Sequence, residues 1–133
     1  RGPGIDKQVL IYPSVDYTMS TASLDENGHG YLLEREKVEW YFSHYFQHNE
    51  DRRAASPLFG PVDANAPTTL IITAGCDPIR DEALAYGKKL IAAGVDVEFK
   101  SFEHMIHAFV NLEDLVPQEC AELYQTIAEF LRP

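Results

Sequence analysis

The sequence predicts an α/β protein in which parallel strands are flanked by helices. Three short apolar runs have the composition of strands, and amphipathic patterns typical of helices separate and follow them. Strands that alternate with helices along a chain form parallel sheets, because each helix packs on one face and returns the chain to the same end of the sheet. Three strands are few for such a sheet, so we expect them to form one side of a larger one.

The expected strands lie at residues 8–12, 69–74 and 96–102. The first two, QVLIY and TLIITA, are continuous apolar runs closed by Pro13 and Gly75. Runs of this kind are typical of strands that are buried on both faces of a parallel sheet. The third, DVEFKSF, alternates between two faces, which predicts a less buried strand nearer an edge.

Apolar residues that recur at helical spacing predict three helices. One stripe covers residues 38–46, and a second covers residues 83–91, with Gly94 placed to end that helix. A third helix begins at Pro117, a residue favoured in the first helical turn. Residues 14–67 separate the first two strands, although a crossover needs only about a dozen residues. The surplus is a candidate lid or cap over a binding site.

The composition limits the classes of partner. Of 133 residues, 45% are hydrophobic, and the formal net charge is −10. This negative charge argues against nucleic acid or an anionic membrane as a partner and favours a neutral or apolar ligand. Two cysteines are too few for a disulfide scaffold, and no apolar run approaches the roughly 20 residues of a membrane-spanning helix.

Asp77 directly follows the second expected strand, in the run GCDPIRDE. Ligands of open α/β sheets bind beyond the carboxyl ends of the strands, where this carboxylate is expected to lie. Asp before Pro is also typical of a helix N-cap, and Asp81 and Glu82 suit a first helical turn. From these eight residues alone, both a catalytic and a capping role remain open.

His107 follows the third expected strand, 30 positions after Asp77, a spacing that fits one crossover. The two side chains can therefore meet at the same edge of the sheet. A carboxylate on one imidazole nitrogen fixes the tautomer and leaves the other nitrogen free to accept a proton. The alternative for His107 alone is a surface-loop histidine without a role.

Several motifs occur in the order found in one esterase family. In that family a strand is followed by D-P-L-R-D-E, then by a helix that contains Ala-Tyr and ends with Ala-Gly-Val, and then by a second strand and H-G-F. This chain has DPIRDE at 77–82, AY at 85–86, AGV at 93–95 and HAF at 107–109, and LIYP at 10–13 is similar to an earlier family strand. The sequence thus resembles the C-terminal half of the hormone-sensitive-lipase-like carboxylesterases and lipases, which are α/β-hydrolases. The resemblance implies that residues 1–133 are the C-terminal half of one α/β-hydrolase domain, and that about 17–51 form a helical cap segment.

The same resemblance implies the roles of individual residues. Asp77 is the expected acid and His107 the expected general base of a Ser-Asp-His triad that hydrolyses carboxylic esters. Asp81 and Glu82 are expected to support them from the start of the helix. In the cap, Trp40 or Phe42 is a candidate for contact with the acyl chain, although the aromatic stripe as a whole is expected to serve packing.

The nucleophile of the family is not found in this sequence. Neither G-x-S-x-G nor H-G-G-G occurs, and none of the six serines has the flanking glycines. Because the order in this fold is Ser, acid, His, we expect the Ser and the oxyanion hole in a missing N-terminal part, and the chain alone to be inactive. Two further departures are Ala108, where the family has Gly, and Glu103-His104 before Met105.

Other interpretations remain open. Cys76 could be a nucleophile at a strand-to-helix turn. Two histidine pairs could bind zinc, although no further ligand accompanies either of them; the pairs are His44 with His48 and His104 with His107. A non-catalytic small-molecule-binding protein of the same fold and an inactive proteolytic fragment are the alternative functions. We expect no cofactor, no metal, no nucleic acid and no membrane span, with a small ester as substrate and a cytoplasmic location; a homo-oligomer is left open.

Overall fold

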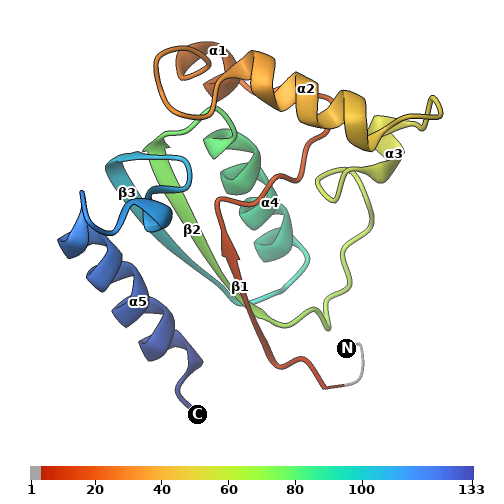
Figure 1. Cartoon of the computed structure of the whole chain (residues 1–133). Helices are drawn as coiled ribbons and strands as arrows, with labels where there is room; N and C mark the ends of the chain where they lie inside the picture. Colours follow the sequence, from red (N-terminus) through yellow and green to blue (C-terminus); the bar gives the residue numbers. More distant parts are fainter. Residues whose placement is uncertain (1–3) are drawn as a thin grey trace.

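The computed structural model describes residues 4–133 and contains a three-stranded parallel sheet. Its strands are β1 (Lys7–Ile11), β2 (Thr68–Cys76) and β3 (Val97–Ile106), in the order β1-β2-β3 (Figure 1). The predicted α/β class and the parallel sheet are confirmed, and each expected strand is present with slightly different bounds. β2 is longer than its apolar run and reaches the residue before Asp77.

Helices cover both faces of the sheet, because successive side chains of β2 point to opposite sides. Leu70 and Ile72 belong to the core under α5 (Pro117–Leu131), whereas Ile71 packs with α4 (Arg80–Ala92). A strand whose two faces are both buried accounts for the continuous apolar run in the sequence.

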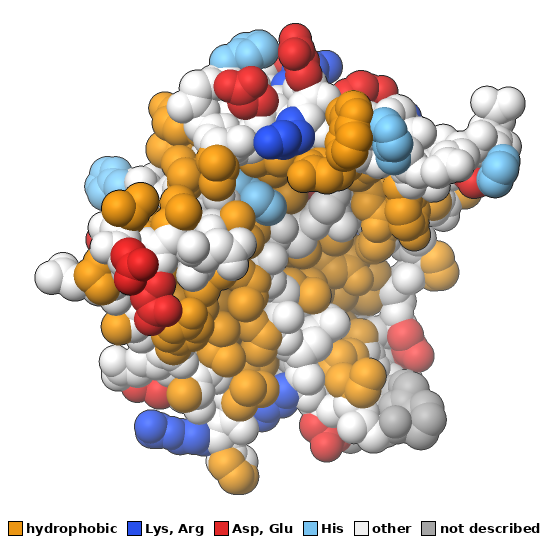
Figure 2. Space-filling model, viewed as in Figure 1, with side chains coloured by type: hydrophobic (Ala, Val, Ile, Leu, Met, Phe, Trp, Pro, Cys, Tyr) orange, Lys and Arg blue, Asp and Glu red, His pale blue; other side chains and the backbone are white. Residues whose placement is uncertain are grey.

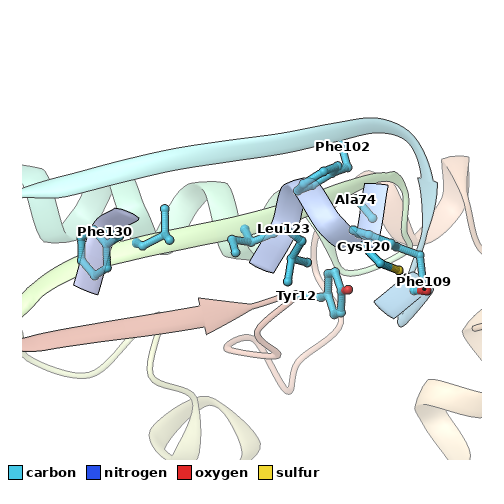
Figure 3. Packing of buried hydrophobic residues seen from close by; sticks show 9 residues of the cluster. Tyr12, Ala74, Phe102, Phe109, Cys120, Leu123 and Phe130 are labelled. Carbon is cyan, nitrogen blue, oxygen red and sulfur yellow. Dashed lines mark hydrogen bonds between the residues drawn. The ribbon is translucent and has the colours of Figure 1, made fainter. Parts of the chain in front are cut away.

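The larger core lies between the sheet and α5. The side chains that form it come from the central strand β2, from β3 and the end of β1, from the 3₁₀ turn η1 (Phe109–Leu112) and from one face of α5 (Figure 3). They are Tyr12, Leu70, Ile72, Ala74, Phe102, Phe109, Cys120, Leu123 and Phe130. Phe102 and Glu98 are four residues apart in β3 and lie on the same face, yet Phe102 is buried because α5 and η1 cover that end of the strand.

Both predicted helix boundaries are present. Gly94 adopts φ +88° directly after α4, and the Val95 N–H reaches back to the Leu90 carbonyl, as expected for a glycine that ends a helix. Pro117 opens α5. None of the helices within residues 4–133 is long and apolar enough to cross a membrane.

The excursion between β1 and β2 contains three helices, α1 (Ser23–Glu26), α2 (Arg35–Tyr45) and α3 (Arg52–Ala55). Figure 1 shows α1 and α2 lying across the end of the sheet to which the strands point. The predicted apolar stripe of α2 is only partly buried: Phe42 packs inward, whereas Tyr45 is 74% exposed. This segment covers the edge where the candidate residues were expected.

Candidate active site

Asp77 is positioned by the end of β2 and by the turn that leads into α4. Its side chain is 1% exposed, and Oδ1 accepts the Ile79 N–H at 2.9 Å. α4 begins only at Arg80, with Ile79 as its N-cap residue. The capping interpretation therefore needs a correction, since the Asp77 carboxylate stabilises the turn before the helix and is not the N-cap.

A break in the β2–β3 register brings the ends of the two strands together. Ala74 pairs with Phe102, but Cys76 pairs with Ile106, so three residues of β3 face the single residue Gly75. A bulge of this kind bends the strand and redirects the side chains that follow it. A Cβ on Gly75 would lie 1.9 Å from the Glu103 carbonyl oxygen, which explains why a glycine occupies this position.

The redirected strand end places His107 against Asp77. The distance from His107 Nδ1 to Asp77 Oδ2 is 2.8 Å, and the imidazole ring lies 5.2 Å from the ring of Tyr12. Because the carboxylate accepts, Nδ1 is assigned as the protonated nitrogen and Nε2 as the acceptor. Among residues 4–133, no side chain or backbone group forms a hydrogen bond with Nε2. The arrangement can therefore take up a proton at the open side of the ring.

Tyr12 supports this ring from the end of β1. Its hydroxyl accepts the Val110 N–H at 3.4 Å, and burial raises the pKa of Tyr12 to about 12. The phenol is therefore neutral at physiological pH. Tyr12 ends the apolar run of the first expected strand, and nothing in that run alone points to a role beside His107.

A cavity of about 260 Å³ opens beside His107. Its other lining side chains are mostly apolar or aromatic and come from the end of β1, the residues before α2, α2 itself and the turn before α4. They are Tyr12, Ser14, Leu33, Val38, Tyr41, Phe42 and Ile79. Figure 2 shows hydrophobic side chains gathered beneath α2 and beside α5 and β1. The cavity suits an apolar group next to a proton acceptor.

The two candidate acyl-contact residues lie in different places. Phe42 lines the cavity next to His107. Trp40 is 54% exposed, stacks 4.1 Å from His44 and faces a separate shallow hollow. The structure therefore brings Phe42, but not Trp40, toward His107, because residues two apart in a helix point to different sides.

Asp81 and Glu82 both lie in the first turn of α4, but neither contacts His107. Asp81 pairs with Arg80 at 2.9 Å and accepts the Ser23 N–H at 3.0 Å. Glu82 is 1% exposed, and its Oε1 accepts the N–H groups of Val15 and Asp16 at 2.6 and 3.1 Å. These carboxylates connect α4 to the chain after β1 and to α1.

The titration of Glu82 predicts how stability depends on pH. Burial, opposed by the N–H donors of Val15 and Asp16, raises its pKa to about 7 from an ordinary 4.5. The folded protein then binds more protons than the unfolded chain between these values. The stabilisation from the protonated group is complete below pH 4.5 and is lost as pH rises through 7, by up to about 3 kcal/mol.

Glu82→Gln tests this pH dependence. The amide stays neutral and its oxygen still accepts both N–H groups. The variant should match the parent near pH 4.5 and exceed its free energy of unfolding by about 3 kcal/mol at pH 8, as measured by urea unfolding. The exposed Glu98→Gln is the control for the loss of one charge. Parallel stability curves for Glu82→Gln and the parent would contradict the assignment.

Ala108, next to His107, adopts φ +62° and ψ +23°, the left-handed region that disfavours a Cβ. Ala108→Gly should raise the free energy of unfolding by about 0.5–1 kcal/mol, because relief of strain exceeds the added entropy of the unfolded chain. Ala128→Gly, in an exposed part of α5, should have the opposite sign and cost about 1 kcal/mol. Thermal melts of the two variants distinguish these outcomes; equal losses would contradict the strain.

The alternative chemistries receive no support from the geometry. Within residues 4–133, no group of three or more His, Cys, Asp or Glu side chains is placed to hold a metal ion. His44 Nδ1 lies 2.8 Å from the Trp40 carbonyl oxygen in its own helix. Cys76 lies in β2 and is a free, partly buried thiol.

An Asp–His pair beyond the carboxyl ends of two adjacent parallel strands, beside an apolar cavity, is a hydrolase-like arrangement. A family model described as alpha/beta hydrolase fold matches residues 1–111. The chain belongs to this family, in its hormone-sensitive-lipase-like branch of carboxylic ester hydrolases. The resemblance inferred from the sequence motifs is confirmed.

Relatives and solved structures agree with this membership. The chain is 34% identical to an ethyl acetate hydrolase of Pseudomonas putida over 84% of its length, and 36% identical to the carboxylic ester hydrolase LipN of Mycobacterium tuberculosis over 86%. It spans 36% and 31% of those relatives, about a third. A hyperthermophilic esterase from the archaeon Pyrobaculum calidifontis superimposes with a TM-score of 0.84 at 33% identity, over 94% of this chain and 42% of that one.

Proposed function

We propose that this chain supplies the acid and the general base of a serine esterase, with Asp77 and His107 in those roles. The hydrogen bond between Asp77 Oδ2 and His107 Nδ1 carries the proposal. It leaves Nε2 as the proton acceptor for a serine hydroxyl. Asp77 then stabilises the imidazolium that forms when the serine attacks the ester carbonyl.

The proposed substrate is a small carboxylic ester with an apolar group. The cavity beside His107 has an apolar lining, to which Phe42 and Ile79 contribute. Relatives named as ethyl acetate hydrolase and carboxylic ester hydrolase support the same class of substrate. The net charge of −10 disfavours strongly anionic esters.

The proposal places the nucleophilic Ser and the oxyanion hole in a complementary N-terminal part of a longer polypeptide or of a second chain. The chain spans about a third of the relatives named above. β1 lies at one edge of the sheet, and within residues 4–133 no further strand pairs with it there. Such an open edge can accept a neighbouring strand.

Hydrolysis of a short p-nitrophenyl ester tests the proposal. A polypeptide that contains both this chain and the complementary part should be active. In that polypeptide, His107→Ala should leave only the residual rate that the oxyanion hole and substrate binding provide. The 133-residue chain alone should release no p-nitrophenol above the buffer rate. Turnover by the chain alone would contradict a nucleophile located elsewhere.

A further inference from the structure

The turn that carries Asp77 is held from outside by a segment far away in the sequence. Helix α4 has no side-chain N-cap of its own, because the residue in that position is Ile79. Its second residue, Asp81, instead donates its N–H to the Ser23 hydroxyl at 3.1 Å. Since a helix cap normally binds the N–H of the second or third helical residue, Ser23 serves as the cap of α4 across 58 positions.

The contact is reciprocal. The Ser23 hydroxyl donates to the Pro78 carbonyl at 2.8 Å, and the Ser23 N–H donates to Asp81 Oδ2 at 3.0 Å. Ser23 is fully buried and opens α1, so the starts of two helices satisfy each other's N–H groups. Buried hydrogen bonds of this type resist rearrangement, because breaking one leaves a polar group without a partner.

Asn27, at the end of α1, holds the other side of the turn. Its side-chain amide lies 3.4 Å from the Gly75 carbonyl and 3.3 Å from the Asp77 carbonyl. Arg80 donates to the same Gly75 carbonyl at 3.0 Å and pairs with Glu26 at 2.8 Å. The segment 23–27 therefore contacts the turn on both sides of Asp77.

We infer that Ser23, assisted by Asn27, is a positioning residue for the Asp77–His107 pair. Ser23 fixes Pro78 and the start of α4, and this fixes the Ile79 N–H that Asp77 Oδ1 accepts. With Oδ1 held, Oδ2 is aimed at His107. The inference rests on the proposed function for its catalytic meaning, but the geometric effect on His107 is independent of turnover.

The test uses a polypeptide that contains both this chain and the complementary N-terminal part, called the full-length protein below. Its histidines are labelled with ¹⁵N, and the His107 Nδ1 proton is followed by NMR. Ser23→Ala should make this proton exchange with solvent about tenfold faster, because the turn opens more often once the cap is lost. The kcat for a p-nitrophenyl ester should fall while KM stays within about twofold, since Ser23 does not line the cavity.

Ser56→Ala is the matched control. Ser56 is also a buried serine with two hydrogen bonds, to the Tyr17 N–H and the Arg52 carbonyl, but it does not contact the turn. It should lower the melting temperature without changing the exchange of the His107 proton. Unchanged exchange in Ser23→Ala, or equal acceleration in Ser56→Ala, would overturn the inference.

Two further outcomes are separable. If Ser23→Ala does not fold, Asn27→Ala serves instead, because Asn27 contacts the same turn from the end of α1. It should also accelerate exchange of the His107 Nδ1 proton, and an exchange rate equal to the parent's would refute the positioning role. If the parent protein hydrolyses no ester but Ser23→Ala still accelerates the exchange, the proposed function fails and the positioning inference stands.

Discussion

Asp77→Asn in the full-length protein should lower kcat by about 10⁴ while leaving the fold intact. The reason lies in two donors that converge on one side chain. The Ile79 N–H and the His107 Nδ1–H both need an acceptor, and the carboxylate offers one oxygen to each. An amide has a single acceptor oxygen, so with that oxygen on Ile79, its NH₂ group faces the imidazole. Nδ1 then becomes the acceptor, Nε2 carries the proton, and the ring cannot deprotonate a serine.

Steady-state hydrolysis of a p-nitrophenyl ester, together with a thermal melt, checks this result. Asp63→Asn makes the same chemical change in an exposed loop and should leave kcat within about twofold. Wild-type turnover in Asp77→Asn would refute the assignment of the acid. A large loss of stability would instead show that the change acts through the turn.

Gly75→Ala should lower the free energy of unfolding by about 3–5 kcal/mol. The added Cβ would meet the Glu103 carbonyl oxygen at 1.9 Å and its carbonyl carbon at 2.6 Å. These are backbone atoms of the neighbouring strand, so they can move away only if the β2–β3 pairing opens. Because Asp77 and His107 directly follow this pairing, the change should also reduce activity.

Gly60→Ala is the matched control for Gly75→Ala. The nearest atom to a Cβ at this position is 3.8 Å away, and its backbone is not in the left-handed region. It should change the free energy of unfolding by no more than about 0.5 kcal/mol in urea titrations of both variants. Equal stability of the two variants would contradict the close approach at Gly75.

The strands and helices could be predicted because local patterns and tertiary packing agree in them. The run at 69–74 is apolar throughout because α4 and α5 bury both faces of β2. The alternation in β3 did not indicate that Phe102 is buried, because η1 and α5 cover that end of an otherwise exposed strand. Burial that comes from a distant segment has no signal in the strand itself.

In the candidate site too, some features have a local sequence pattern and others depend on distant segments. Motif order and strand ends were enough to predict that Asp77 and His107 meet, and the distance of 2.8 Å agrees with that geometry. Whether a residue of α2 reaches the cavity depends on the rotation of the helix, which separates Phe42 from Trp40. The sequence does not distinguish Ser23 from the other serines without flanking glycines, because a helix cap supplied across 58 positions leaves no local pattern.

Covalent labelling of the full-length protein with a serine-directed fluorophosphonate, followed by peptide mass mapping, locates the nucleophile that His107 is proposed to activate. We expect one phosphonylated serine outside the 133 residues of this chain and loss of labelling in His107→Ala. Labelling at Cys76 or at any serine of this chain, or labelling that persists without the imidazole, would contradict it.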